Sequence, residues 1–119
     1  EGRECVINGD GETSRDFCYV RNVVQANLRA ALTTDADAIG RVYNVAVGQR
    51  TTLNELHAAL ATAIEATRPG LRVAPPARAA FRAGDVRHSL ADISLARRLL
   101  GYEPSHTIAA GMVETVAAY

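Results

Sequence analysis

The chain of 119 residues contains no lysine, so all thirteen of its positively charged side chains are arginine. This absence excludes any catalytic site that includes a lysine. The chain also has no apolar run near the ~18 residues that a membrane-spanning helix needs, and no charged segment followed by an apolar stretch of the kind found in secretory leaders. The sequence therefore gives no indication of membrane insertion or secretion, and we expect a cytoplasmic protein.

The chain has only two cysteines and a formal net charge of zero. Cys5 and Cys18 are too few for a disulfide scaffold and lie in apolar runs, where a free thiol behaves as a small hydrophobe, although a bridge between them stays open. Thirteen acidic groups cancel the thirteen arginines and are interspersed with them, so nothing suggests a nucleic-acid or anionic-lipid partner. With 48% hydrophobic residues, the chain should form one domain and bury a core.

Apolar patterning predicts an α/β domain with a small sheet of short strands and about four helices. The expected strands lie at residues 5–8, 16–20, 41–47 and 71–74. The expected helices lie at residues 22–34, 53–68 and 92–100, and from residue 107 onward. Thr52 and Glu55 form a capping box for the second helix, Asn22 and Asp92 are expected N-caps, and Gly101 is an expected C-terminal stop. The near-continuous apolar run at 41–47 favours a strand covered on both faces, as in a parallel sheet.

Some ionisable residues have simpler explanations than a functional site. Asp35 and Asp37 lack a third oxygen ligand nearby, so we expect a solvated loop rather than a metal site. His57 has neither a second histidine nor an acid at i+4, which indicates a surface histidine rather than a ligand or a base.

The first candidate site is a glycine-rich reversal followed by an arginine. Gly9 and Gly11 adopt positive φ at little cost, so the backbone can double back there. Arg15 leaves this loop with a planar fork of donors that stays charged and suits a phosphate. The alternative is a surface turn whose arginine pairs with a nearby acid in solvent, worth about 0–1 kcal/mol. Three acids are close enough in the sequence, at Asp10, Glu12 and Asp16.

A second polar loop contains Arg82 and Asp85 around a single glycine. If the fold brings this loop beside Arg15, two guanidiniums could clamp a pyrophosphate while the carboxylate accepts hydrogen bonds from a sugar diol. Neither loop alone justifies this hypothesis.

The sequence resembles the carboxy-terminal third of the nucleotide-sugar epimerases and dehydratases, which are extended short-chain dehydrogenases. The stretches that carry the resemblance are GDGETSRDFCYV at residues 9–20, YNVAVG at 43–48, RAGDVRHSLAD at 82–92 and LLGY at 99–102. They fall in the family's order and at about its spacing, over nearly the whole chain. The chain is most similar to the UDP-N-acetylglucosamine 4-epimerase branch.

The resemblance implies a role for each matching position. Arg15 and Arg82 would bind the nucleotide's diphosphate, and Asp85 would bind the ribose hydroxyls. The strand that contains Val6 and Asn8 would lie along the uracil and use its backbone groups. The partner implied is a UDP-sugar.

Three further positions bear on this comparison. Phe17 would line the uracil pocket. Ser89 stands where relatives restricted to non-acetylated sugars have a bulky aromatic ring, and its small side chain leaves room for a 2-N-acetyl group. This favours UDP-N-acetylglucosamine and UDP-N-acetylgalactosamine as ligands. Arg21 departs from the acid that many relatives have after this strand.

The family transfers a hydride between the sugar C4 and NAD, with the tyrosine of a Tyr-x-x-x-Lys pair as base and a G-x-x-G-x-x-G turn that holds the nucleotide. This chain has neither motif and begins without methionine. We therefore expect residues 1–119 to be a substrate-binding fragment without its Rossmann half. NAD would serve the complete enzyme, whereas the fragment should bind no cofactor and catalyse nothing alone.

Alternatives remain open. The chain could be the same part of a 4,6-dehydratase, a decarboxylase, a reductase or a UDP-glucose 4-epimerase, or a stand-alone binding or oligomerisation module. An exposed edge at residues 43–47 would invite pairing with a second copy, so we also expect a homodimer.

Overall fold

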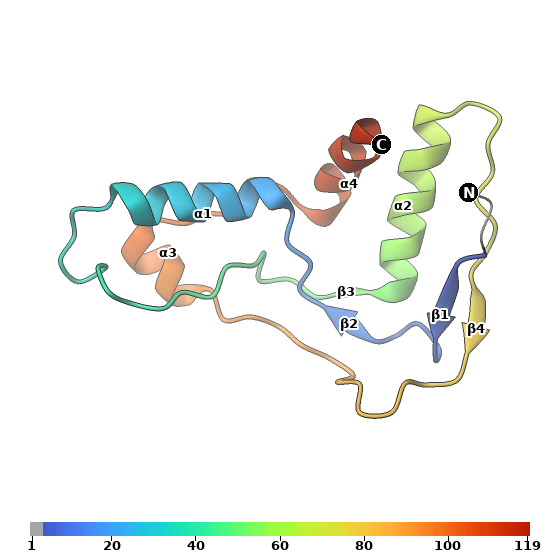
Figure 1. The fold of residues 1–119 in the computed structure, drawn as a ribbon, viewed down its shortest axis with the longest axis horizontal. Coiled ribbons are helices and arrows are strands. Elements are labelled where there is room, and N and C mark those ends of the chain that lie inside the picture. Colours follow the sequence, from blue (N-terminus) through green and yellow to red (C-terminus); the bar gives the residue numbers. More distant parts are fainter. Residues whose placement is uncertain (1–3) are drawn as a thin grey trace.

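The computed structural model describes residues 4–119, which form four helices and four short strands (Figure 1). The strands are β1 (Val6–Asn8), β2 (Ser14–Arg15), β3 (Thr51–Thr52) and β4 (Ala77–Ala79). The helices are α1 (Val20–Leu32), α2 (Leu53–Thr67), α3 (Ser94–Leu100) and α4 (Ile108–Ala118). The predicted α/β class with four helices is confirmed. None of the helices in this part of the chain is long and apolar enough to cross a membrane.

The strands form two separate pairs instead of one sheet. β1 runs parallel to β4, and β2 runs antiparallel to β3. Figure 1 shows the β1/β4 pair at one end of the molecule, next to α2, whereas α1 and α3 lie side by side at the other end. The β2/β3 pair lies between these two ends, so it connects them.

The molecule is flat and extended, with dimensions of 52 × 36 × 19 Å and a radius of gyration of 17.1 Å. A compact chain of this length would have a radius of gyration of about 13–14 Å. The main apolar core is correspondingly small and lies around α1 and α3. Its buried members are Ala26, Ala38, Ala46, Ile93, Ala96, Leu100 and Tyr102.

The α2 helix begins as predicted. The Thr52 hydroxyl accepts the Glu55 N–H at 3.1 Å, and the Glu55 carboxylate accepts the Thr52 N–H at 2.7 Å. This reciprocal capping box satisfies two donors at the helix start. Because β3 leads directly into α2, the helix N-terminus is fixed against the β2/β3 pair.

Two of the predicted strands are wrong. Residues 41–47 belong to neither sheet within residues 4–119, and Val42 is 90% exposed. The run has strand-forming residues but no neighbouring strand to pair with, and the Val47 N–H is bonded to the Asp16 carboxylate instead. Residues 71–74 also form no strand. The strand expected there begins only after the two prolines, as β4, where the Ala77 N–H reaches the Cys5 carbonyl. The homodimer was expected from a strand edge at 43–47, and without that strand it loses this basis and stays an untested prediction.

A third predicted strand and two predicted caps are displaced. The strand expected at 16–20 is β2 at residues 14–15, and α1 already starts at Val20 after Tyr19. Ile93 precedes α3, although the Asp92 carboxylate still accepts the Ser94 N–H at 2.9 Å. Gly101 ends α3 in the left-handed conformation, as predicted. Thr107 caps α4 through the Ala110 N–H.

Asn22 is not a cap but a buried connection between α1 and the segment before α4. Its side chain is 0% exposed. The Asn22 side-chain oxygen accepts the backbone N–H groups of Ser105 and His106 at 2.9 and 3.0 Å, and its amide donates to the His106 carbonyl at 2.8 Å. Such a side chain satisfies backbone groups that would otherwise lack partners.

Both cysteines are free, so the bridge that was left open does not form. Burial raises the pKa of the half-buried Cys18 thiol.

The substitution Asn22→Ala should lower the free energy of unfolding by about 2–3 kcal/mol, because two backbone N–H groups and one carbonyl lose their partner. Asn27→Ala is a matched control on the exposed face of the same helix, and it should change the free energy by less than about 0.5 kcal/mol. Urea denaturation of the two variants measures the difference. Equal stabilities would show that the Asn22 contacts do not support the fold.

Candidate functional site

The two loops singled out in the sequence meet at β2. The Ser14 N–H donates to the Arg87 carbonyl at 2.9 Å, and the Ser89 N–H donates to the Ser14 carbonyl at 3.1 Å. The Ser14 hydroxyl also lies 2.8 Å from Nδ1 of His88. Residues 87–89 therefore run beside β2 like an additional strand, on the side not occupied by β3. This pairing places the polar residues of both loops at one location.

Arg15 and Asp85 form an ion pair across this junction. Nη2 of Arg15 lies 2.5 Å from Oδ1 of Asp85, and Nη1 donates to the Ser14 carbonyl at 2.8 Å. The two side chains are 29% and 40% exposed. The alternative of a local pair with one of the neighbouring acids of Arg15 is therefore wrong, because its carboxylate partner comes from the second loop.

A second ion pair, which the sequence analysis missed, joins the same loops. Arg87 donates from Nη1 and Nη2 to the two carboxylate oxygens of Asp10, at 3.0 and 2.6 Å. The Arg87 guanidinium also lies 5.4 Å from the centre of the Phe81 ring. The bond from Arg87, together with the Glu12 N–H, holds the pKa of Asp10 below its usual value. The opposite charges in the two loops indicated that ion pairs could form between them. Spacing along the sequence does not show which acid pairs with which arginine.

Gly9 and Gly11 have φ of +75° and +79°, as the glycine-rich reversal required. Each glycine is also needed for space. A Cβ on Gly9 would overlap the Phe81 ring, and a Cβ on Gly11 would overlap the side chain of Asn54. The reversal is thus packed against both the second loop and the first turn of α2.

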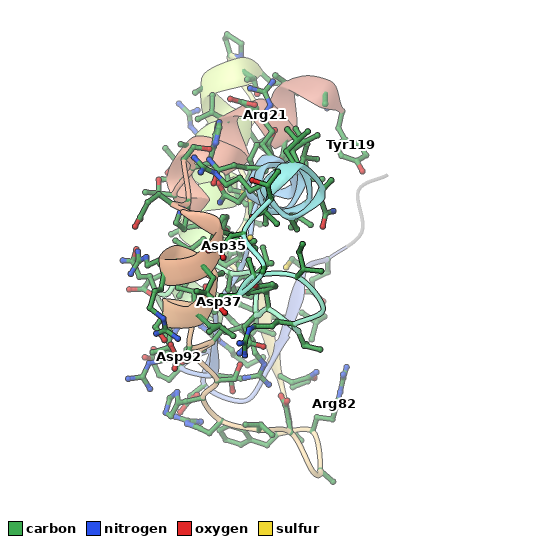
Figure 2. The ribbon with its side chains drawn as sticks, turned by 90° about the vertical axis from the view of Figure 1, so that its left-hand side faces the viewer. Arg21, Asp35, Asp37, Arg82, Asp92 and Tyr119 are labelled. Carbon is green, nitrogen blue, oxygen red and sulfur yellow. The ribbon has the colours of Figure 1, made fainter. Side chains whose placement is uncertain are left out.

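The other predicted site residues of the second loop, Arg82 and Ser89, take no part in these two ion pairs. Arg82 is exposed, and Figure 2 shows its side chain extending away from the ribbon. Its carbonyl accepts the Asp85 N–H at 3.2 Å, so both residues belong to one turn. Ser89 is exposed and is the last residue of the segment beside β2, where its N–H donates to the Ser14 carbonyl. The structure thus brings Arg15 and Asp85 into contact, whereas the Arg82 guanidinium points elsewhere.

The three predicted uracil-binding residues come from two places. Val6 is exposed and Asn8 is half-buried, and both lie in β1 rather than in the β2/β3 pair. Phe17 is half-buried in a hollow between the start of α1 and α4, which Tyr19 and Met112 also line.

The residues set aside in the sequence analysis lie outside this junction. Asp35 and Asp37 lie in the turn after α1 (Figure 2), where the Asp35 carboxylate accepts the Asp37 N–H. Within residues 4–119 no group of three or more potential ligands is placed to hold a metal ion. The expectation of a surface position for His57 is wrong, because it is half-buried and its Nε2 is covered without a partner in the described chain.

Arg21, the departure noted in the sequence, pairs with Glu114 of α4 at 3.2 Å. The same carboxylate accepts the Tyr19 hydroxyl at 2.9 Å and lies 3.2 Å from Nε2 of His106. These partners, with the Tyr19 hydroxyl first, hold the pKa of Glu114 below its usual value. This cluster fastens α4 to the start of α1.

The Asp10–Arg87 pair should make loop stability depend on acid pH. Because the folded pKa of Asp10 lies below its unfolded value of about 3.9, its stabilising contribution is complete above about pH 4 and is lost as the pH falls through the folded pKa. The difference in unfolding free energy between the native chain and Asp10→Asn should therefore be constant near neutrality and shrink toward pH 2. Asp37→Asn is the control. A difference that ignores pH would mean that the pair does not form in solution.

Several known proteins are similar to this chain in sequence and in fold. Residues 1–46 match the family described as the NAD dependent epimerase/dehydratase family. A UDP-glucose 4-epimerase of Mycolicibacterium smegmatis is 38% identical, over 97% of this chain and 34% of that protein. A UDP-glucose 4-epimerase structure from Thermotoga maritima, determined with UDP-glucose, is 37% identical with a TM-score of 0.81, over 98% of this chain and 34% of the other.

A third comparison concerns another sugar. The structure of a UDP-N-acetylglucosamine 4-epimerase from Methanobrevibacter ruminantium, in complex with UDP-N-acetylmuramic acid, is 33% identical with a TM-score of 0.80, again over 98% of this chain and 34% of the other. The chain spans about one third of the length of these relatives. In sequence and in fold, it therefore resembles about one third of a nucleotide-sugar 4-epimerase.

Proposed function

We propose that the chain is the nucleotide-sugar-binding part of an NAD-dependent 4-epimerase and that it binds the UDP portion of the substrate at the junction of its two loops. The observation that carries this proposal is the Arg15–Asp85 ion pair, which joins a glycine-rich reversal to the second polar loop. It unites residues 70 positions apart, for which the sequence resemblance implies adjacent roles on one nucleotide.

The geometry supports a mode of binding in which a phosphate oxygen replaces the Asp85 carboxylate on Arg15. Carboxylates and phosphates both suit a guanidinium fork, so the Asp85 carboxylate occupies a position on Arg15 that a phosphate oxygen could take. An ion pair this exposed contributes about 0–1 kcal/mol, and a diphosphate with more negative charge can displace it. Displacement leaves Asp85 free to accept hydrogen bonds from the ribose hydroxyls.

The remaining positions have supporting roles in this proposal. Arg82 shares a turn with Asp85, so it joins the diphosphate when the turn closes over the ligand. The backbone of β1 at Val6 and Asn8 would lie along the uracil, and Phe17, which lies in the separate hollow beside α4, is the further residue proposed to contact it.

The residues of this chain do not fit an NAD site. The chain has no G-x-x-G-x-x-G turn and, without lysine, no Tyr-x-x-x-Lys pair. We therefore assign this chain to binding of the substrate and derive no step of hydride transfer from it.

For the sugar we propose UDP-N-acetylglucosamine and UDP-N-acetylgalactosamine, because Ser89 is small and exposed and leaves room for an acetamide. UDP-glucose is the second candidate. It is favoured by the UDP-glucose 4-epimerases that are 38% and 37% identical to this chain.

Titration calorimetry should detect weak binding of UDP, with a dissociation constant on the order of 1 mM. Arg15→Ala and Arg82→Ala should each weaken it at least about tenfold, since a hydrogen bond to a charged group contributes about 1.5–3 kcal/mol. Asp85→Ala should abolish the preference for UDP over 2′,3′-dideoxy-UDP, because it removes the acceptor for the diol. Arg98→Ala, an exposed change on α3, is the control. Affinities that ignore the first three substitutions would refute the site.

The sugar assignment can be tested separately with Ser89→Tyr. A tyrosine ring should fill the space of the acetamide and weaken UDP-N-acetylglucosamine binding about tenfold or more, while UDP-glucose binding changes little. Competition between the two sugars for the native chain and the variant measures this. Equal loss for both would mean that Ser89 does not face the sugar.

A further inference from the structure

Asn54, in the first turn of α2, connects three separate segments of the chain through its side chain and backbone. Its amide nitrogen donates to the Asp10 carbonyl at 3.1 Å and to the Glu12 carboxylate at 2.6 Å. Its side-chain oxygen accepts from Nη2 of Arg78, in β4, at 2.7 Å. Its backbone N–H donates to the Gly11 carbonyl at 3.1 Å.

These contacts are not needed to start the helix. Thr52 and Glu55 already form the reciprocal capping box of α2, so the Asn54 amide is free to bind elsewhere. It is directed at the glycine-rich reversal, and it lies so close to Gly11 that a Cβ there would overlap it. Asparagine fits this place because its amide is donor and acceptor at once. The Asp10 carbonyl and the Glu12 carboxylate need a donor, and Arg78 needs an acceptor.

Outside α2, the reversal is held by the Arg87 guanidinium on the Asp10 carboxylate and by the Gly9 N–H, which donates to the Ala79 carbonyl at 2.8 Å. A loop closed by glycines has many accessible backbone conformations, and ordering them on ligand binding would reduce affinity. Besides the bonds to Asn54, the Leu53 N–H donates to the Thr13 carbonyl at 3.0 Å. The start of α2 thus holds residues 10–13, and Arg15 follows two residues later.

We propose that Asn54 is a positioning residue that fixes the reversal in the conformation from which Arg15 reaches the diphosphate. This inference rests on the proposed function. Asn54 does not contact the ligand itself; it lowers the conformational freedom that binding must remove.

The test compares Asn54→Ala and Asn54→Asp with Asn44→Ala in the 119-residue chain. Asn44 is a matched control, because it is exposed and its amide donates to the Asp92 carbonyl at 3.1 Å, away from the reversal. The measurements are UDP affinity by calorimetry, the midpoint of thermal unfolding, and hydrogen exchange at the amides of Glu12 and Ser14.

Asn54→Ala should weaken UDP binding about tenfold and accelerate exchange at both amides, with little change in the unfolding midpoint. Asn54→Asp keeps an acceptor for Arg78 but replaces the donor to Glu12 by a negative charge. It should weaken UDP binding at least as much, and lowering the pH toward 4 should recover part of the loss. Asn44→Ala should change none of these measurements.

The outcomes separate this inference from the function on which it rests. If the native chain does not bind UDP, both are overturned. If it binds and Asn54→Ala binds equally well, only the positioning role is overturned. A fall in the unfolding midpoint that accounts for the whole loss of affinity would also overturn it, because Asn54 would then act through general stability.

Discussion

The backbone pairing of β2 with residues 87–89 is the constraint on which the candidate site depends. The bonds from Ser14 to Arg87 and from Ser89 to Ser14 have ordinary lengths of 2.9 and 3.1 Å, and they join two loops that the chain separates by some seventy residues. The ion pairs Arg15–Asp85 and Asp10–Arg87 form on this frame. Both are exposed enough for solvent to weaken them, so the backbone bonds hold the loops and the charges remain available to a ligand.

The flat shape explains why so much of the chain is open. The α1 helix exposes an apolar stripe, made of Val20, Val24, Leu28 and Leu32, and its inner face packs on the small core around α3. The chain covers about one third of the relatives that it matches. A body this thin would contact a nucleotide on one side only, which is the physical reason for the weak affinity proposed above.

Local chemistry was predictable where neighbouring residues decide the outcome. The Thr52–Glu55 box, the Gly101 stop and the positive φ of Gly9 and Gly11 follow from side chains within a few positions. Prediction failed where a distant partner decides. Residues 41–47 have the composition of a strand, but no neighbouring strand in the described chain pairs with them. Asn22 was expected to cap α1, but its side chain is buried and bonded to Ser105 and His106.

The sequence by itself determined the class of the fold, the helices and the two polar loops, because these depend on periodicity, on glycine geometry and on the permanent charge of arginine. Only the tertiary structure decided which charges meet. Arg15 has three acids close in sequence and pairs with none of them, because the register of β2 against residues 87–89 brings Asp85 to it. The same register places Asp10 beside Arg87, and the position of the first turn of α2 places Asn54 beside the reversal. Such pairings depend on distances through space, which spacing along the chain does not contain.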